Sequence, residues 1–149
     1  MNDPMEEIQA IIFGNIRQAY NDTVADHAVR PRHAGSLPDP DGFATVHSEC
    51  GESMEIWLKV KNNNIEDISF WTDGCAATIA CGSMTSELVR GKNVADVLKM
   101  DFMTVVGGLD GLPEGNYHCA KLATDAVKTA LQDYLTLQRD PWKKAYRRK

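Results

Sequence analysis

Strict alternation of apolar with polar or aromatic residues over positions 54–61 is the feature that most constrains the fold of this chain. The apolar positions are spaced two apart: Met54, Ile56, Leu58 and Val60. Such alternation is typical of a β-strand with one buried face. Residues 62–64 are asparagines, which favour turns, and the apolar pattern resumes over 68–72. The stretch 53–73 therefore predicts a β-hairpin, and residues 44–49 predict a third strand ahead of it.

Helical patterns lie on both sides of this predicted sheet. A capping sequence at residues 3–6 opens a helical region that we expect to continue until Pro31 interrupts it. The clearest helix spans residues 119–137 and has one apolar stripe: Leu122, Ala123, Ala126, Val127, Ala130, Leu131, Tyr134 and Leu135. The order of helix, sheet and helices predicts an α+β fold, in which helices pack on a three-stranded antiparallel sheet.

Between the sheet and the long helix, the sequence predicts three more helical pieces. One follows Gly74 and ends near Gly91, a short one spans 93–98, and another spans 101–108. The chain has 149 residues, no internal repeat, and enough apolar residues to form a core without disulfides. We therefore expect a single domain over residues 1–139.

Residues 140–149 form a basic tail with five Lys or Arg and one Asp, and Trp142 and Tyr146 lie among them. This composition is typical of a loosely ordered terminus, and it also suits a docking arm for an acidic partner. The sequence leaves both interpretations open.

Charge and hydropathy exclude several classes of function. Residues 1–139 carry 11 Lys and Arg against 20 Asp and Glu, which argues against nucleic-acid binding. The chain has no apolar run of the roughly 18 residues that a membrane span requires. The first residues, MNDPMEEI, are acidic, unlike a signal peptide. We therefore expect a cytoplasmic protein whose cysteines are thiols or metal ligands.

The chain has four cysteines, and three of them lie where predicted elements join. Cys50 falls in a turn between strands, Cys75 where a strand gives way to a helix, and Cys119 at the start of the long helix. A helix N-terminus lowers the pKa of a nearby thiol and so favours the metal-binding thiolate. Thiolates select zinc, iron–sulfur clusters or Cu(I). Cys81 instead lies among apolar residues of a helix, and we expect it to be a small buried hydrophobe.

The spacing of these cysteines alone is a weak signal for a metal site. Cys50 and Cys75 are 25 residues apart and Cys75 and Cys119 are 44 apart, unlike the CxxC pairs of zinc fingers. The fold itself must bring them together. Glu52 and His118 lie next to these cysteines in sequence, and each could supply a fourth ligand. Taken singly, they are ordinary turn and helix-start residues.

Four longer segments resemble a known family. They read DHAVRPRHAGSL at 26–37, CGESMEIWLKV at 50–60, FWTDGCAATIACGSMTSELVRGK at 70–92 and YHCAKLATDAVKTALQDY at 117–134. Together they resemble the U-type iron–sulfur cluster assembly scaffolds, the family of IscU and of the N-terminal domain of NifU. The family's fold, a three-stranded antiparallel sheet with packed helices, agrees with the independent pattern.

The resemblance implies a scaffold rather than an enzyme. Such a protein accepts sulfur from a cysteine desulfurase, assembles a [2Fe–2S] cluster with iron and electrons, and passes the cluster to recipient apo-proteins. It implies Cys50, Cys75 and Cys119 as cluster ligands, with Cys119 our choice for the first sulfur acceptor. Glu52 stands where the family has Asp, and His118 matches the family's His. Zinc in the cluster-free form and a homodimer also remain open.

Two rival functions remain open at this stage. The first is a zinc-bound sulfur-transfer protein that activates a desulfurase. The chain lacks the insertion that marks the zinc-dependent branch between Cys75 and Cys119, which argues against it. The second is a domain whose metal merely holds the fold together; here the apolar pattern already suffices for a core.

Overall fold

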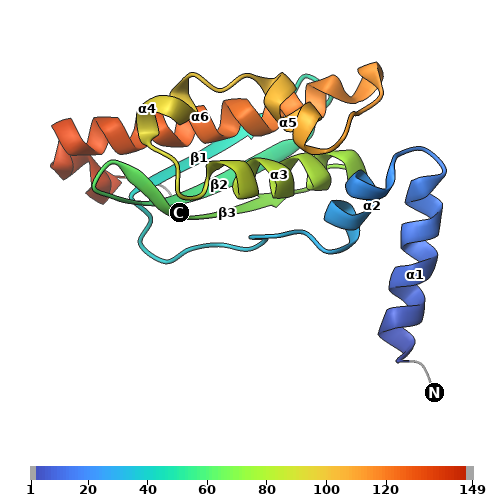
Figure 1. The fold of residues 1–149 in the computed structure, drawn as a ribbon. Coiled ribbons are helices and arrows are strands. Elements are labelled where there is room, and N and C mark those ends of the chain that lie inside the picture. The colour runs from blue at the N-terminus through green and yellow to red at the C-terminus, as the bar shows by residue number, and fades with distance from the viewer. Residues whose placement is uncertain (1–2, 147–149) are drawn as a thin grey trace.

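The computed structural model describes residues 3–146, and it confirms the α+β fold. Figure 1 shows the elements, which are α1 (Pro4–Arg17), α2 (Asp22–Val29), β1 (Gly42–His47), β2 (Ser53–Lys61), β3 (Asn64–Thr72), α3 (Ala76–Val89), α4 (Val94–Leu98), α5 (Phe102–Gly108), η1 (Glu114–Asn116), α6 (Tyr117–Arg139) and η2 (Pro141–Tyr146). Here η marks a 3₁₀-helix.

The three strands form an antiparallel sheet in the order β1-β2-β3. Ile56 on the central strand pairs with Ala44 on β1 and Phe70 on β3, so apolar side chains of all three strands share one face. Asn62 and Asn63 both have positive φ, which asparagine tolerates better than most residues, and they reverse the chain between β2 and β3. The hairpin expected from the sequence is confirmed.

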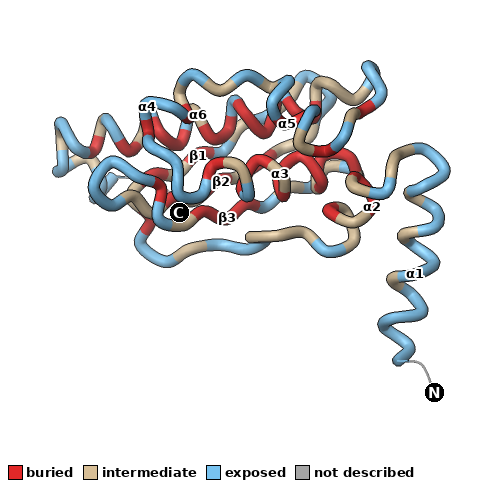
Figure 2. The backbone as a smooth tube through the Cα atoms, viewed as in Figure 1, coloured by how far each residue is buried: buried red, intermediate tan, exposed pale blue. Residues whose placement is uncertain are grey.

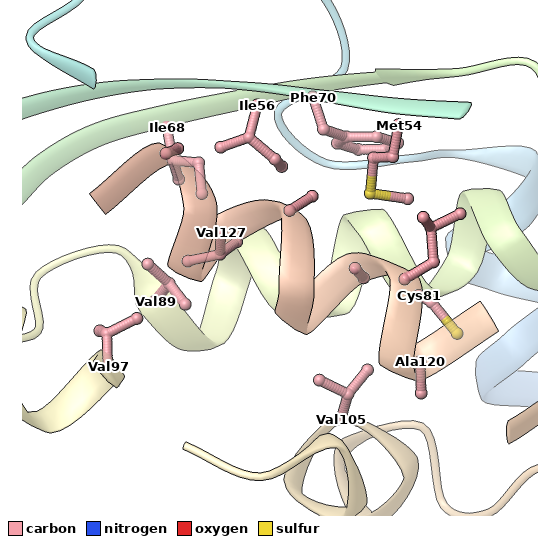
Figure 3. Close-up of a cluster of buried hydrophobic side chains, with 14 of the residues drawn as sticks. Met54, Ile56, Ile68, Phe70, Cys81, Val89, Val97, Val105, Ala120 and Val127 are labelled. Carbon is pink, nitrogen blue, oxygen red and sulfur yellow. The ribbon is translucent and has the colours of Figure 1, made fainter. Parts of the chain in front are cut away.

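The core lies between this face of the sheet and two helices, α3 and α6 (Figure 2). α6 packs on β1 and β2, and α3 packs on β3. α5 packs against α3 and α6. Figure 3 shows the centre of this core, where Met54, Ile56 and Phe70 of the sheet face Val127 of α6. Cys81 is fully buried here, as we expected for a small apolar residue.

The first helical region differs from the expectation, because it is two helices rather than one. The second helix begins after Asn21, whose side-chain oxygen accepts a hydrogen bond from Val24 N at 2.8 Å and caps α2. The Asn21 side-chain amide also donates to the carbonyl oxygens of Leu109 and Gly111, at 3.0 and 3.1 Å. The break is thus fixed by residues far away in sequence. Elsewhere the differences are small, since β1 starts two residues earlier and α6 is longer at both ends than expected.

The helix α1 projects from the body of the protein, and none of its residues is buried (Figures 1 and 2). Its large apolar side chains Met5, Ile8, Ile11 and Ile12 are between 45% and 65% exposed. No helix in the described part of the chain is both long enough and apolar enough to cross a membrane.

The described part of the basic tail, residues 140–146, turns back along the domain. Lys144 forms an ion pair with Asp39 at 2.8 Å, and Lys143 pairs with Asp140 at 3.3 Å. Trp142 and Tyr146 remain 63% and 81% exposed. The basic residues Arg147, Arg148 and Lys149 lie outside the described residues.

Candidate metal centre

Three segments that are distant in sequence meet at one end of the sheet. In an antiparallel sheet of this order, the β1–β2 loop and the C-terminal end of β3 lie at the same end of the sheet. The loop carries Cys50 and Glu52, β3 leads directly into the helix that starts after Cys75, and α6 begins two residues before Cys119. The topology therefore gathers side chains that the sequence spacing leaves far apart.

Glu52, His118 and Cys119 form the centre of the site. One metal-ligating atom from each of them lies within 4.8 Å of those of the other two. His118 Nε2 is 3.5 Å from a carboxylate oxygen of Glu52 and 3.5 Å from Cys119 Sγ. Cys119 is fully buried, whereas the His118 side chain is 40% exposed. The group thus combines an inner sulfur with a ring nitrogen that solvent can reach.

Cys75 joins this group through a hydroxyl. It is exposed and occupies the N-cap position of α3, directly before the first helical residue. Its Sγ lies 3.5 Å from Thr78 Oγ1, and the same hydroxyl lies 3.4 Å from Cys119 Sγ. Both sulfurs therefore contact one threonine hydroxyl.

Cys50 lies apart from the other four predicted ligands. It is exposed in the β1–β2 loop, and within residues 3–146 it does not belong to the group of mutually close ligand atoms. It lines a groove of about 430 Å³ together with His118 and Lys121. The predicted ligand Cys50 is thus at the rim of the site, and only movement of its loop would bring it to the centre.

The electrostatics of Cys119 differ from the sequence-based expectation. The pKa of its thiol is raised to about 11, mainly by burial and in smaller part by the negative charges of Cys75 and Glu52. Hydrogen bonds with Thr78 and Asn116 lower this pKa but do not compensate. The expectation of a lowered pKa for Cys119 at a helix N-terminus is therefore wrong. Loss of hydration around a fully buried thiolate outweighs the helix dipole.

Gly74 is required by the close packing of this site. A Cβ atom at this position would lie 2.6 Å from Thr78 Cβ and 2.7 Å from a carboxylate oxygen of Glu52. Both distances are far below van der Waals contact, so no larger residue fits without displacement. The absence of a side chain at Gly74 lets Glu52 reach Thr78.

The donor set determines which chemistry the site supports. A thiolate, an imidazole and a carboxylate together suit zinc or iron, whereas Mg²⁺ and Ca²⁺ prefer oxygen ligands alone. Cys81 does not belong to the group of close ligand atoms within residues 3–146, and burial raises the pKa of its thiol.

Thr78 also belongs to the site, although the sequence patterns did not indicate it. The one signal for it is its position three residues after Cys75 at the start of a helix, because residues i and i+3 share one helix face. This spacing alone does not indicate a functional residue.

Comparisons with known proteins point to one family. A family model described as the NifU-like N-terminal domain matches residues 19–140. The chain is 47% identical over 116 residues to the Archaeoglobus fulgidus protein named iron-sulfur cluster assembly scaffold protein IscU 1, covering 77% of this chain and 76% of that protein. An Aquifex aeolicus protein, named iron-sulfur cluster assembly scaffold protein IscU, is 37% identical over 122 residues, covering 80% of this chain and 78% of that protein.

A solved structure shares the fold. It is titled a nitrogen-fixing NifU-like protein (N-terminal) from Brucella abortus, and it superposes with a TM-score of 0.64 at 26% sequence identity. The match covers 81% of this chain and 97% of that chain. The matched family region starts at residue 19, so the projecting helix α1 precedes it.

Proposed function

We propose, from the premise that this chain belongs to the NifU-like N-terminal domain family, that it is a scaffold for assembly and transfer of an iron–sulfur cluster. The observation that carries the proposal is the convergence of Glu52, His118 and Cys119, with Cys75 and Cys50 at its edge. A relative named as a scaffold protein, at 47% identity, supports the same role. The cargo that we infer is a [2Fe–2S] cluster held by the three cysteines with Glu52 or His118.

Cys119 is the proposed acceptor of sulfur from a cysteine desulfurase. Its thiolate attacks the outer sulfur of a donor persulfide, so that an S–S bond forms on Cys119 and the donor cysteine leaves as a thiolate. His118 Nε2, 3.5 Å from Sγ, is placed to take the proton that the thiol loses. Glu52, 3.5 Å from that nitrogen, stabilises the resulting imidazolium. No net oxidation occurs in this step.

Access to Cys119 requires local opening, because its side chain is fully buried. The segments beside it, η1 and the β1–β2 loop, are short and largely exposed, and such segments open at a lower free-energy cost than the core. Movement of the loop would also bring Cys50 toward the other ligands. A site of this kind can bind a cluster and later release it to a recipient protein.

A zinc-bound sulfur-transfer protein is the second candidate. It is favoured by one observation: Glu52, His118 and Cys119 with Cys75 supply the four mixed ligands that a tetrahedral zinc ion takes. In that case the protein would relay sulfur to other acceptors and stimulate a desulfurase without building a cluster.

Anaerobic reconstitution separates the two candidates. The protein is incubated with ferrous iron, cysteine, a reductant and a cysteine desulfurase, and then analysed by absorption spectroscopy and for iron and acid-labile sulfide. A scaffold acquires equal amounts of iron and sulfide and turns red-brown. A colourless, zinc-loaded protein that stimulates the desulfurase would establish the second candidate instead.

Serine variants test the ligand set within the same experiment. Cys50→Ser, Cys75→Ser and Cys119→Ser should each prevent a stable cluster, because a hydroxyl is a poor substitute for thiolate at iron. Cys81→Ser is the matched control and should retain most of the cluster. Cluster loss in Cys81→Ser but not in Cys119→Ser would contradict the proposed ligands.

A further inference from the structure

The hydroxyl of Thr78 lies at the centre of the site and contacts three of its predicted ligands. Thr78 is fully buried in the first turn of α3. Its Oγ1 is 2.5 Å from a carboxylate oxygen of Glu52, 3.4 Å from Cys119 Sγ and 3.5 Å from Cys75 Sγ. These three partners come from three different segments of the chain, so a single hydroxyl connects the β1–β2 loop, α3 and α6.

The direction of these hydrogen bonds follows from the number of protons available. A threonine hydroxyl has one proton to donate and two lone pairs that accept. An ionised carboxylate only accepts, so the hydroxyl proton must point to Glu52. Cys119 Sγ is a second acceptor within reach of the same proton, while Cys75 Sγ can either donate to the hydroxyl or accept from it. Each of these hydrogen bonds joins the Thr78 side chain to a predicted metal ligand.

We propose that Thr78 is a positioning residue that holds Glu52, Cys75 and Cys119 together and thereby sets the ligand geometry offered to a metal; this inference rests on the proposed function. Sulfur binds metal as thiolate, which has no proton to donate. On metal binding, the Thr78 hydroxyl can therefore turn its proton from Glu52 to a ligand sulfur. Glu52 is then free to approach the metal while the sulfur keeps a hydrogen-bond donor.

A second threonine in the same helix provides a matched control. Thr85 is also fully buried in α3, but its hydroxyl has no hydrogen-bond partner within the described part of the chain. Replacing either threonine by valine removes one hydroxyl at nearly constant volume. A general effect of a buried threonine-to-valine change in α3 should appear in both variants, whereas a positioning role should appear only at Thr78.

The test measures Co²⁺ binding to wild type, Thr78→Val, Thr78→Ser and Thr85→Val under anaerobic conditions. Cobalt–thiolate absorption bands report both the dissociation constant and the sulfur ligation. Loss of a residue that orients metal ligands costs roughly 10- to 100-fold in metal affinity. We expect Thr78→Val to weaken Co²⁺ binding by about this factor and to alter the charge-transfer bands. Thr78→Ser should restore both, and Thr85→Val should resemble wild type.

Thr78→Val with wild-type affinity and bands, or with a loss that Thr78→Ser does not restore, would overturn the role of Thr78. If Thr78→Val does not fold in a thermal melt, Thr78→Ser is compared with Thr78→Ala, since these two variants differ only by the hydroxyl oxygen; equal affinities would again refute the proposal. Failure of the proposed function would give a different result, because the wild-type protein itself would then bind Co²⁺ without thiolate bands.

Discussion

Replacement of Gly74 by alanine should disturb both the ligands and the fold. The added Cβ would lie 2.6 and 2.7 Å from Cβ and Cγ2 of Thr78, and 2.7 Å from a carboxylate oxygen of Glu52. Ordinary contacts between such atoms are about 3.5–4.0 Å, so each contact is short by about 1 Å. Thr78 is fully buried in a helix and has little freedom to move, whereas the Glu52 carboxylate is the far end of a flexible side chain. Glu52 should therefore move first.

The magnitude follows from two opposing contributions. Overpacking of one methyl group in a tight site costs about 1–3 kcal/mol. Gly74 is not among the glycines with positive φ, so alanine gains about 0.4–1 kcal/mol by restricting the unfolded chain. The net loss is about 1–2 kcal/mol, which corresponds to a fall in melting temperature of roughly 2–8 °C for a domain of this size. Displacement of Glu52 should also weaken Co²⁺ binding about tenfold.

Thermal unfolding by circular dichroism and Co²⁺ titration measure these two effects. Gly107→Ala is the control, because a Cβ there would meet no atom within 4 Å and alanine favours the interior of a helix. It should melt at the wild-type temperature or slightly above it. Gly74→Ala with wild-type melting and wild-type Co²⁺ affinity would show that the close approach of Glu52 to Thr78 is not a property of the protein.

Three further predictions follow from the described contacts. Because the pKa of Cys119 is raised to about 11, the unfolded chain loses this proton at lower pH than the folded protein, and the free energy of unfolding should fall between about pH 9 and pH 11. Urea titrations should give a smaller fall for Cys119→Ser, and the same dependence on pH in both proteins would contradict the raised pKa. Deleting residues 1–17 should change the melting temperature by less than about 3 °C, since α1 buries no side chain; a larger loss would mean that α1 packs on the domain. Gly82→Ala should destabilise by about 1–2 kcal/mol because its Cβ would lie 2.5 Å from the ring of Phe70, and a stabilised variant would argue against this packing.

Elements with a local pattern were predictable from the sequence. The period-two alternation at 54–61 and the asparagine turn define a hairpin within about 20 residues, without any distant contact. The 119–137 helix was equally clear, since its apolar stripe repeats over several turns. Both elements are confirmed. In each of them, the apolar positions that define the sequence period are mostly the positions that face the core.

The break between α1 and α2 could not be predicted in the same way. It depends on hydrogen bonds from Asn21 to carbonyl oxygens at Leu109 and Gly111, whose proximity only the folded chain creates. Periodicity likewise shows that α1 is amphipathic, but it does not tell whether the rest of the chain covers the apolar face. Within residues 3–146, no other segment covers it.

The sequence indicated candidate residues for the site but not their geometry. Motif resemblance indicated Cys50, Glu52, Cys75, His118 and Cys119; the structure brings the last four close together and leaves Cys50 at the rim. The raised pKa of Cys119 depends on burial, which spacing along the chain does not reveal. Thr78 could not be chosen either, because a hydroxyl becomes a central group only when three distant segments place their polar atoms around it.

The unequal burial of the cysteines is itself an argument about the role of this site. A permanent structural metal is normally enclosed by ligands from a rigid framework. Here Cys119 is fully buried, while Cys75 and Cys50 are exposed and Cys50 lies in a loop at the edge of a groove. One buried inner ligand with outer ligands on the surface allows a metal to be exchanged by local movement of the β1–β2 loop and η1. The large apolar core stays intact during such a movement, which supports a cargo that is carried and released rather than a metal that holds the fold.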